Sequence, residues 1–398
     1  MLQISEKGKN APASPIRKLT PYADAAQKRG TKIYHLNIGQ PDIKSPDIIW
    51  DTLKNYDVSP IAYTDSKGNI ALREKICKRF ANDGIDINLD DILVTTGGSE
   101  AMMFAFMSTL NPGDELIIPE PYYANYTNFA VQVGVKIIPI TAKIENGFAL
   151  PSMEEFEKLI TPKTKGIVII NPNNPTGYLY TQEELEQLSE IIKKHDLYLY
   201  ADEVYRYYCY GGKHFSVMNL KNIEQNVILF DSMSKTYSEC GIRIGELISR
   251  NKEVIAASLK FAMARLCPPA LGQLVAEASM DTEQKYFDDV RDEYMTRRDA
   301  FIGELVKIPG VVCPMPEGAF YAIAKLPVDS SEKFAKWLLE EYNYNGETVM
   351  MAPASGFYAT EGMGVDEVRL AYVLKVEDLK KAVIILREAL KVYPGRIK

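Results

Sequence analysis

The sequence predicts an α/β protein with a mostly parallel sheet flanked by helices and a second, smaller α+β unit. From about Ile70 onward, short apolar runs alternate with amphipathic stretches, which is typical of crossover units on a parallel sheet. After about Met280 the pattern changes to a long charged helix followed by shorter helix and strand pieces. The 398 residues are 46% hydrophobic and 25% charged, so there is ample apolar material for a core.

Seven apolar runs are the expected strands of the large sheet. In chain order they are ILVTT (92–96), ELIIP (115–119), KIIPI (136–140), GIVIIN (166–171), LYLYAD (197–202), VILFDS (227–232) and ELISR (246–250). Two helix starts between them have capping-box spacing, at Ser152 with Glu155 and at Thr181 with Glu184. The large unit is therefore expected to be built from strands alternating with helices.

The chain is expected to divide into three parts. Residues 1–45 would form an N-terminal arm and part of the small domain, 46–285 the large domain, and 286–398 the small C-terminal domain. The long helical pattern TEQKYFDDVRDEYMTRRDAFIGELVKI begins the last part, and GAFYAIAKL is expected to be a strand within it. The polar arm before Thr20 is expected to wrap another surface, which in a dimer could be the partner.

Composition excludes several classes of function. The formal net charge of −7 opposes nucleic-acid binding, which needs clustered Lys and Arg. The five cysteines show no C-x-x-C spacing and the three histidines are far apart, so neither a disulfide framework nor a metal site is expected. The N-terminus has no apolar signal segment, and no run is long enough to span a membrane. These observations predict a cytoplasmic protein without a membrane or nucleic-acid partner.

Polar residues follow several of the expected strands, where open parallel sheets bind their ligands. GGSEA (97–101) joins a strand to a helix start, whose free N–H groups would hold an anion such as phosphate. PNNPTG follows the fourth run, DEVY follows the fifth with Asp202 and Tyr205, and Lys235 follows the sixth. Each signal alone also fits a tight turn, a proline-rich loop or a solvated lysine.

One cofactor uses all of these groups together. Pyridoxal phosphate presents an aldehyde that a lysine amine can trap as a Schiff base, a ring nitrogen that needs a carboxylate, and a phosphate. A carboxylate keeps the ring nitrogen protonated, which makes the ring an electron sink for a carbanion at the substrate α-carbon. The residue types therefore predict a pyridoxal-phosphate enzyme in which Lys235 bonds the cofactor.

Four motifs make the chain similar to a known family: NPNNPTG, DEVY, SMSKTYSECGIRIG and VRLAYV, in this order. From about Ile16 to the C-terminus the sequence resembles the class I/II pyridoxal-phosphate-dependent aminotransferases of fold type I, in the aspartate aminotransferase superfamily. The resemblance implies a large domain with a mostly parallel seven-stranded sheet, a smaller α+β domain built from N- and C-terminal segments, and a homodimer with shared active sites.

The resemblance also implies roles for individual residues. Lys235, Asp202 and Tyr205 would be catalytic, with Asp202 at the ring nitrogen and Tyr205 at the phenolic oxygen. The residues placed around the cofactor are Tyr63 from the partner, Gly98, Ser99, Glu100 through its backbone, Tyr123, Asn174, Asp202, Tyr205, Ser232, Ser234, Lys235 and Arg243. The residues placed around the substrate are Gly39, Asn174, Arg265 and Arg369, of which Arg369 would grip the α-carboxylate. No metal is implied.

The expected reaction is a transamination, in which an L-amino acid gives its nitrogen to the cofactor and 2-oxoglutarate collects it. Aspartate is the first expected donor, because Arg265 before the Pro-Pro pair resembles an arginine that crosses from the partner to hold a distal carboxylate. The spacing is shorter than usual, and Ser99 stands near where other aspartate-specific relatives carry a lysine. An aromatic donor is the alternative. If Arg265 is structural, donor preference would be sought around Ile38, Arg17 and residues 352–364.

Two further interpretations remain open from the sequence. A lyase or decarboxylase of the same fold would use the same electron sink without a 2-oxo acid acceptor. A cofactor-binding regulator would need a basic helix-turn-helix segment, which the sequence lacks, and the net charge opposes DNA contact.

Overall fold

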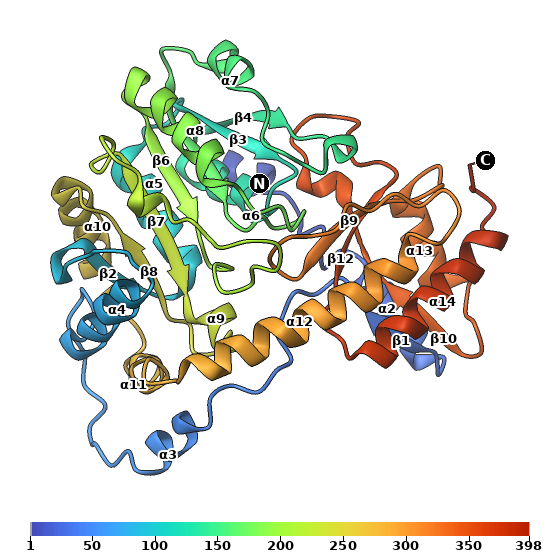
Figure 1. Cartoon of the computed structure of the whole chain (residues 1–398), viewed down its shortest axis with the longest axis horizontal. Coiled ribbons are helices and arrows are strands. Elements are labelled where there is room, and N and C mark those ends of the chain that lie inside the picture. Colours follow the sequence, from blue (N-terminus) through green and yellow to red (C-terminus); the bar gives the residue numbers. More distant parts are fainter. Residues whose placement is uncertain (1, 398) are drawn as a thin grey trace.

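The computed structural model describes residues 2–397, and its largest element is a seven-stranded sheet with the order β2-β8-β7-β6-β5-β3-β4 (Figure 1). Strand β8 runs antiparallel to both of its neighbours, and the other pairs are parallel. The seven expected strands are confirmed as β2 (Ile92–Thr95), β3 (Glu115–Glu120), β4 (Lys136–Thr141), β5 (Thr164–Ile170), β6 (Tyr198–Asp202), β7 (Val227–Ser232) and β8 (Gly245–Ile248).

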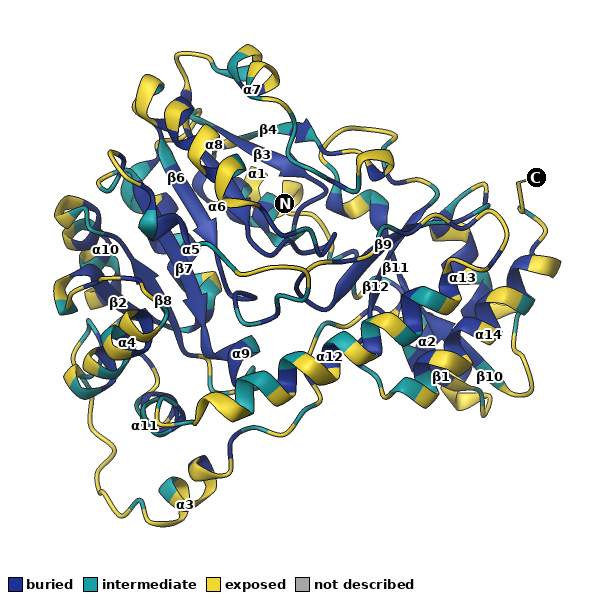
Figure 2. Cartoon of the chain, viewed as in Figure 1, coloured by how far each residue is buried: buried dark blue, intermediate teal, exposed yellow. Residues whose placement is uncertain are grey.

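Both faces of this sheet are buried, which explains why its strands read as continuous apolar runs. In β5, Ile167 and Ile169 join one core cluster while Val168 and Ile170 join the other, since successive side chains point to opposite faces. The first cluster receives helices α4 (Ile70–Asn82), α8 (Gln182–His195) and α11 (Ala270–Ser279), and the second receives α5 (Gly97–Thr109), α6 (Asn125–Val133) and α10 (Lys252–Arg265). Figure 2 shows most of these strands in dark blue between partly exposed helices, whereas the edge strand β4 is mostly of intermediate burial.

Local sequence signals set the helix ends. Ser152 and Thr181 both form the expected capping boxes, at the starts of α7 (Met153–Leu159) and α8. The short helix α9 (Met233–Thr236) follows β7 directly, with Ser232 as its N-cap. Single 3-10 turns complete the connections at Leu89–Asp91, Ile144–Asn146, Val217–Asn219 and Ala354–Phe357.

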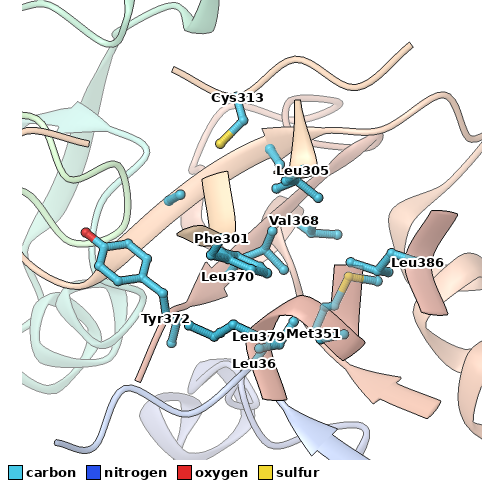
Figure 3. Close-up of a cluster of buried hydrophobic side chains, with 14 of the residues drawn as sticks. Leu36, Phe301, Leu305, Cys313, Met351, Val368, Leu370, Tyr372, Leu379 and Leu386 are labelled. Carbon is cyan, nitrogen blue, oxygen red and sulfur yellow. The ribbon is translucent and has the colours of Figure 1, made fainter. Parts of the chain in front are cut away.

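A second group of elements packs around two small sheets. Strands β1 (Lys32–His35) and β10 (Glu347–Met350) pair in parallel, and β11 (Ala352–Pro353), β12 (Glu367–Ala371) and β9 (Tyr321–Lys325) form an antiparallel sheet. The surrounding helices are α2 (Thr20–Lys28), α12 (Gln284–Leu305), α13 (Ser331–Glu340) and α14 (Val376–Val392). Figure 3 shows their shared core, in which Phe301 and Leu305 of α12 belong to one cluster with Leu370 of β12 and Leu386 of α14.

The long charged pattern is confirmed as α12, which runs from beside α11 to the small sheets (Figure 1). The expected boundary between residues 285 and 286 falls in the first turn of this helix. Residues 32–35 of the N-terminal part pair with residues 347–350 near the C-terminus, although the three-part division itself stays a prediction.

Two N-terminal segments lie outside these layers. Helix α1 (Glu6–Asn10) and the arm after it lie on α6 of the same chain, where Asn128 Nδ2 donates to the Pro12 carbonyl at 3.3 Å. Helix α3 (Ile48–Lys54) packs against α11 at the lower edge of Figure 2, and Trp50 on it is 54% exposed. Trp50 therefore remains available for contact with another surface.

None of the helices within residues 2–397 combines the length and the apolar character needed to cross a membrane. Within the same residues, no group of three or more His, Cys, Asp or Glu side chains is arranged to hold a metal ion.

Candidate active site

A cavity of about 540 Å³ lies at the carboxyl ends of the parallel strands and reaches β9 and β12 of the small sheet. Most of the residues singled out in the sequence line it. They are Gly39, Gly98, Ser99, Tyr123, Asn174, Asp202, Tyr205, Ser232, Ser234, Lys235, Arg243 and Arg369. Tyr63, Glu100 and Arg265 are not among the lining residues.

Lys235 lies in the short helix α9, which follows β7 directly. Ser232 Oγ accepts from the Ser234 amide at 3.1 Å, and the Tyr208 hydroxyl donates to the Lys235 carbonyl at 2.6 Å. The Lys235 amine donates to the Gly39 carbonyl at 2.9 Å and lies 3.9 Å from Cys240 Sγ. The backbone is therefore fixed from two directions, while the amine reaches across the cavity.

Asp202 is the last residue of β6 and is buried. Its carboxylate accepts from the Val204 amide at 3.3 Å and from the Tyr126 hydroxyl at 3.4 Å, both long for hydrogen bonds to a charged acceptor. Burial raises the pKa of Asp202 to about 7, and nearby Asp231 adds to the rise while Lys235 opposes it. A cation bound beside this carboxylate would favour its ionised form.

A chain of contacts joins the side of the cavity formed by the large sheet to the side formed by β9 and β12. Asn174 Nδ2 donates to the Tyr205 hydroxyl at 3.4 Å, and Arg369 Nη1 donates to Asn174 Oδ1 at 3.2 Å. Arg369 is 1% exposed and its guanidinium lies 4.6 Å above the Tyr321 ring. Burial lowers the pKa of Arg369, and the surrounding tyrosines oppose that effect. Within residues 2–397 no carboxylate lies within 4 Å of its guanidinium nitrogens, so the buried cation can receive an anion.

The start of α5 and Arg243 together form a cradle for an anion. Gly97 has φ +72°, and a Cβ atom there would lie 2.3 Å from Arg243 Nη2. Arg243 Nη1 in turn donates to the Cys240 carbonyl at 2.9 Å and to Ser234 Oγ at 3.5 Å. The free N–H groups of the first turn, which includes Ser99, carry the positive end of the helix dipole.

Glu100 and Arg265 pair with each other outside the cavity. Glu100 Oε2 accepts from the Thr96 amide at 2.7 Å and lies 3.2 Å from Arg265 Nε, and Arg265 Nη2 donates to the Val94 carbonyl at 3.3 Å. Tyr63 is 79% exposed and lies outside the cavity. The expected roles of Tyr63 and Arg265 both need a second chain, and they stay predictions.

Several residues that line the cavity were not predicted from the sequence, and Tyr321 is one of them. Its hydroxyl lies 3.0 Å from the Tyr205 hydroxyl and donates to the Gly39 carbonyl at 3.3 Å. A Cβ atom on Gly39 would lie 1.8 Å from the Tyr321 hydroxyl oxygen, so glycine is needed there. Tyr126, which reaches Asp202 from α6, was also missed. Both tyrosines sit in ordinary strand and helix patterns, and only the tertiary fold brings them to the site.

Comparison with known proteins agrees with this geometry. The family model described as aminotransferase class I and II matches residues 31–384. The chain belongs to this family. It is a transaminase whose fold matches aspartate aminotransferase structures.

Individual members of the aminotransferase family match over almost their whole length. An aspartate aminotransferase of Geobacillus stearothermophilus is 31% identical, over 96% of this chain and 97% of the relative. Aromatic-amino-acid aminotransferase 2 of Thermococcus litoralis is 30% identical, over 98% and 99%. The structure of the aspartate aminotransferase from Thermus thermophilus with maleate superposes with a TM-score of 0.89 at 27% identity, covering 98% of this chain and 100% of that one.

Proposed function

We propose that this aminotransferase uses pyridoxal 5'-phosphate to move the amino group of an L-amino acid to 2-oxoglutarate by a ping-pong mechanism, with aspartate as the first donor to test. The observation that carries the proposal is the single cavity that the Lys235 amine, the Asp202 carboxyl and the Arg243 guanidinium share. An amine, a buried acid and an anion cradle are the three groups that this cofactor requires.

The residues of the cavity fit the cofactor. The long hydrogen bonds of Asp202 leave its carboxylate able to accept from a protonated ring nitrogen. The start of α5 and Arg243 offer donors to a phosphate, and Gly97 lets Arg243 lie against the start of α5, since a Cβ atom there would meet Arg243 Nη2. When bound, the cofactor supplies an aromatic ring that accepts the electron pair released at the substrate α-carbon. Ser232 and Ser234 would complete the phosphate contacts, and Tyr123 would cover the ring.

The protein's own groups then bind the substrate and move its proton. Arg369 would grip the α-carboxylate with its fork of N–H donors, since it is a buried cation without a charged partner among residues 2–397. The Lys235 amine would take the proton from the α-carbon and return it. Burial raises the pKa of Tyr205 well above its ordinary value, so its hydroxyl stays protonated and can donate to the cofactor's phenolic oxygen. Asn174 contacts both Tyr205 and Arg369, so it would connect the position of the cofactor's phenolic oxygen with the binding site of the α-carboxylate.

Two donor classes have specific support. Aspartate is supported by the relatives named aspartate aminotransferase that match over nearly the whole chain. An aromatic donor is supported by the Thermococcus litoralis relative and by apolar side chains that line the cavity, Ile16, Ile38 and Met102.

We further propose that the protein acts as a homodimer in the cytoplasm. A set of large apolar side chains is exposed along α3, the segment after it, the end of α10, the loop that follows and the start of α11: Trp50, Leu53, Val58, Ile61, Tyr63, Met263, Leu266 and Leu271. An apolar surface of this kind marks an interface, and Tyr63 on it would reach the partner's phosphate. The cysteines of the chain are free thiols, which suits a reducing compartment.

A panel of donors assayed with 2-oxoglutarate tests the function. The protein loaded with pyridoxal phosphate should form glutamate from 2-oxoglutarate with parallel-line kinetics, and aspartate should give the highest specificity constant. Turnover of an amino acid without any 2-oxo acid would refute the transfer reaction. If phenylalanine or tyrosine gives a higher specificity constant than aspartate, the protein is an aromatic amino acid aminotransferase.

A further inference from the structure

One buried carboxylate of the large sheet has no role in the proposed function. Glu120 is the last residue of β3 and is fully buried, yet it does not line the cavity. Among residues 2–397, no Lys, Arg or His side chain has a nitrogen within 4 Å of its carboxylate oxygens. Burying a carboxylate without a cation is costly unless hydrogen bonds compensate. The donors around Glu120 therefore indicate what it holds.

All of the donors to Glu120 are uncharged, and two of them come from a distant segment. Oε1 accepts from the Thr141 hydroxyl at 2.8 Å, at the end of the neighbouring strand β4. Oε2 accepts from two successive backbone amides, Ala359 at 2.7 Å and Thr360 at 3.1 Å. Both of these residues are exposed, and both lie between β11 and β12 of the small sheet. A buried side chain of the large sheet thus holds an exposed loop of the second group of elements.

The backbone next to Glu120 holds the same loop. The Tyr122 amide donates to the Phe357 carbonyl at 2.9 Å. Residues 357–360 (the Phe357 loop) are therefore fixed to the end of β3 by three hydrogen bonds, two of them from Glu120. Hydrogen bonds to a carboxylate are about twice as strong as those between neutral groups. Glu120 therefore contributes most of this attachment.

The Phe357 loop lies against Arg369. The Arg369 guanidinium is 5.0 Å from the centre of the Phe357 ring, and Phe357 is fully buried. The Tyr358 hydroxyl donates to Glu367 at 2.6 Å, two residues before Arg369 on β12. The position of the loop therefore bears on Arg369 in two ways, through the Phe357 ring and through the strand that carries the arginine.

The orientation of the Arg369 guanidinium depends on few contacts. Nη1 donates to Asn174 and Nη2 to the Asn37 carbonyl, whereas Nε is buried without a hydrogen-bond partner among residues 2–397. Two parallel hydrogen bonds to a carboxylate require a defined guanidinium plane, and stacking on an aromatic ring fixes such a plane. A shift of the Phe357 ring should therefore change how well Arg369 receives a carboxylate.

We propose that Glu120 is a positioning residue for the substrate's α-carboxylate. It holds the Phe357 loop against the large sheet, and the loop keeps the Arg369 guanidinium in its binding orientation. The inference rests on the role proposed for Arg369 and adds to it a residue that touches neither substrate nor cofactor. The amino acid and the 2-oxo acid both carry the carboxylate that Arg369 would bind, so loss of Glu120 should weaken the binding of both.

Two variants at position 120 isolate the hydrogen bonds to the loop. Glu120→Leu removes both acceptor oxygens. Glu120→Gln keeps one oxygen for the amides of Ala359 and Thr360, and the Thr141 hydroxyl can rotate to accept from the new amide nitrogen. Hydrogen exchange of the backbone amides in residues 357–364 should be faster than in the wild type for Glu120→Leu, and unchanged for Glu120→Gln.

Steady-state kinetics of the cofactor-loaded proteins measure the functional effect. Glu120→Leu should raise KM for the amino donor and for 2-oxoglutarate by a similar factor, about 10-fold, and leave kcat within about twofold. A weaker hold on the carboxylate affects the bound substrate and the transition state alike. The dissociation constant of maleate, measured by calorimetry, should rise by the same factor, and that of the cofactor should not change. Glu120→Gln should keep the wild-type values.

Glu184→Leu is the matched control. Glu184 also accepts from a hydroxyl and from backbone amides, those of Tyr178, Thr181 and Leu150. It does not line the cavity, and none of these donors belongs to the small sheets. Glu184→Leu should lower the temperature of thermal unfolding but keep the wild-type KM values and the wild-type affinity for maleate.

The outcomes separate this inference from the proposed function. If the wild type forms no glutamate from 2-oxoglutarate with any donor, the proposed function fails, while hydrogen exchange and maleate binding still test the link from Glu120 to Arg369. If Glu120→Leu keeps the wild-type exchange of the loop, or keeps the wild-type KM values and maleate affinity, the inference fails alone.

Two further results would also overturn the inference. If Glu120→Leu lowers kcat and cofactor affinity as strongly as it raises KM, the residue supports the fold in general and not Arg369 in particular. If Glu120→Gln is impaired as much as Glu120→Leu, the hydrogen bonds to the Phe357 loop are not what the site depends on.

Discussion

At the scale of single residues, Lys235 is the side chain on which the proposed chemistry depends most directly. Its amine reaches across the cavity to the Gly39 carbonyl, and the short helix α9 that carries it is fixed by Ser232 and Tyr208. Lys235→Ala should abolish the visible absorbance of the bound cofactor, since no amine remains to bond its aldehyde. Absorbance spectra, followed by borohydride reduction and peptide mapping, check this. Recovery of the cofactor on a different lysine of the wild type would contradict the assignment.

Asp202 should make the cofactor-free protein sensitive to pH. Burial raises the pKa of Asp202 to about 7, whereas in the unfolded chain it is about 3.9. Between these values the folded state binds the proton and the unfolded state does not, so stability falls as pH rises through this window. From pH 5 to pH 8 the free energy of unfolding of the cofactor-free wild type should fall by about 2 to 3 kcal/mol relative to that of cofactor-free Asp202→Asn. The variant has no titrating group at position 202.

Denaturant unfolding of both cofactor-free proteins at pH 5 and pH 8 measures this difference. Other buried acids, such as Glu203 with a pKa raised by burial to about 8, titrate in both proteins and cancel in the comparison. Equal pH dependence of the two proteins would show that Asp202 is already ionised without the cofactor.

At the scale of elements, the start of α5 is the expected binding place of the cofactor's phosphate. Gly97→Ala would place a Cβ atom 2.3 Å from Arg243 Nη2 and force a non-glycine residue to φ +72°. The variant should lose about 1 to 3 kcal/mol of stability through backbone strain, and its dissociation constant for the cofactor should rise because Arg243 is displaced. Thermal unfolding and fluorescence titration with pyridoxal phosphate measure the two effects.

Gly303→Ala is the control for a glycine substitution in a helix. Gly303 lies inside α12 with nothing within 4 Å of a Cβ atom there, so alanine should raise stability by about 0.5 to 1 kcal/mol and leave cofactor affinity unchanged. If Gly97→Ala binds the cofactor with an unchanged dissociation constant, the start of α5 does not bind the phosphate.

The elements of the large sheet could be predicted from the sequence because local signals determine them. Strand β5 reads as one apolar run since both of its faces are buried, and α8 begins where Thr181 and Glu184 form a capping box. The cavity residues Asp202 and Lys235 were found because Asp202 ends one apolar run and Lys235 follows another.

The contacts between distant segments could not be predicted in this way. Tyr321 reaches the Gly39 carbonyl from the small sheet, and no local signal distinguishes it from any other strand tyrosine. The pairing of Arg265 with Glu100 was hidden for the same reason, because α10 packs on α5 only in the folded chain. Resemblance to a family supplied roles for residues, but the surroundings of each side chain came from the tertiary structure.

At the scale of the whole molecule, the exposed apolar surface around α3 predicts a dimer. Trp50 is 54% exposed, and its burial between two chains would remove a large apolar area from water. Trp50→Asp should therefore shift the protein toward the monomer and lower transaminase activity, if Tyr63 of each chain completes the site of the other. Sedimentation velocity combined with activity assays checks both effects.

Val392→Asp is the matched control, because Val392 is 60% exposed at the end of α14, away from α3. This variant should keep the wild-type sedimentation coefficient. A wild type that sediments as a monomer with full activity would contradict both the dimer and the shared site.

The pairing of β1 with β10 also has a consequence for how the protein is made. The Tyr34 hydroxyl donates to Glu347 at 2.8 Å across 313 positions of sequence. At a synthesis rate of about 5 to 20 residues per second, β1 leaves the ribosome roughly 15 to 60 seconds before β10. During that interval an early strand with buried side chains has no partner, although the strands of the large sheet can already pair with one another. Strand β1 therefore reaches its final position only after β10 has been made, and a nascent chain stalled before β10 would expose β1 to chaperones and proteases.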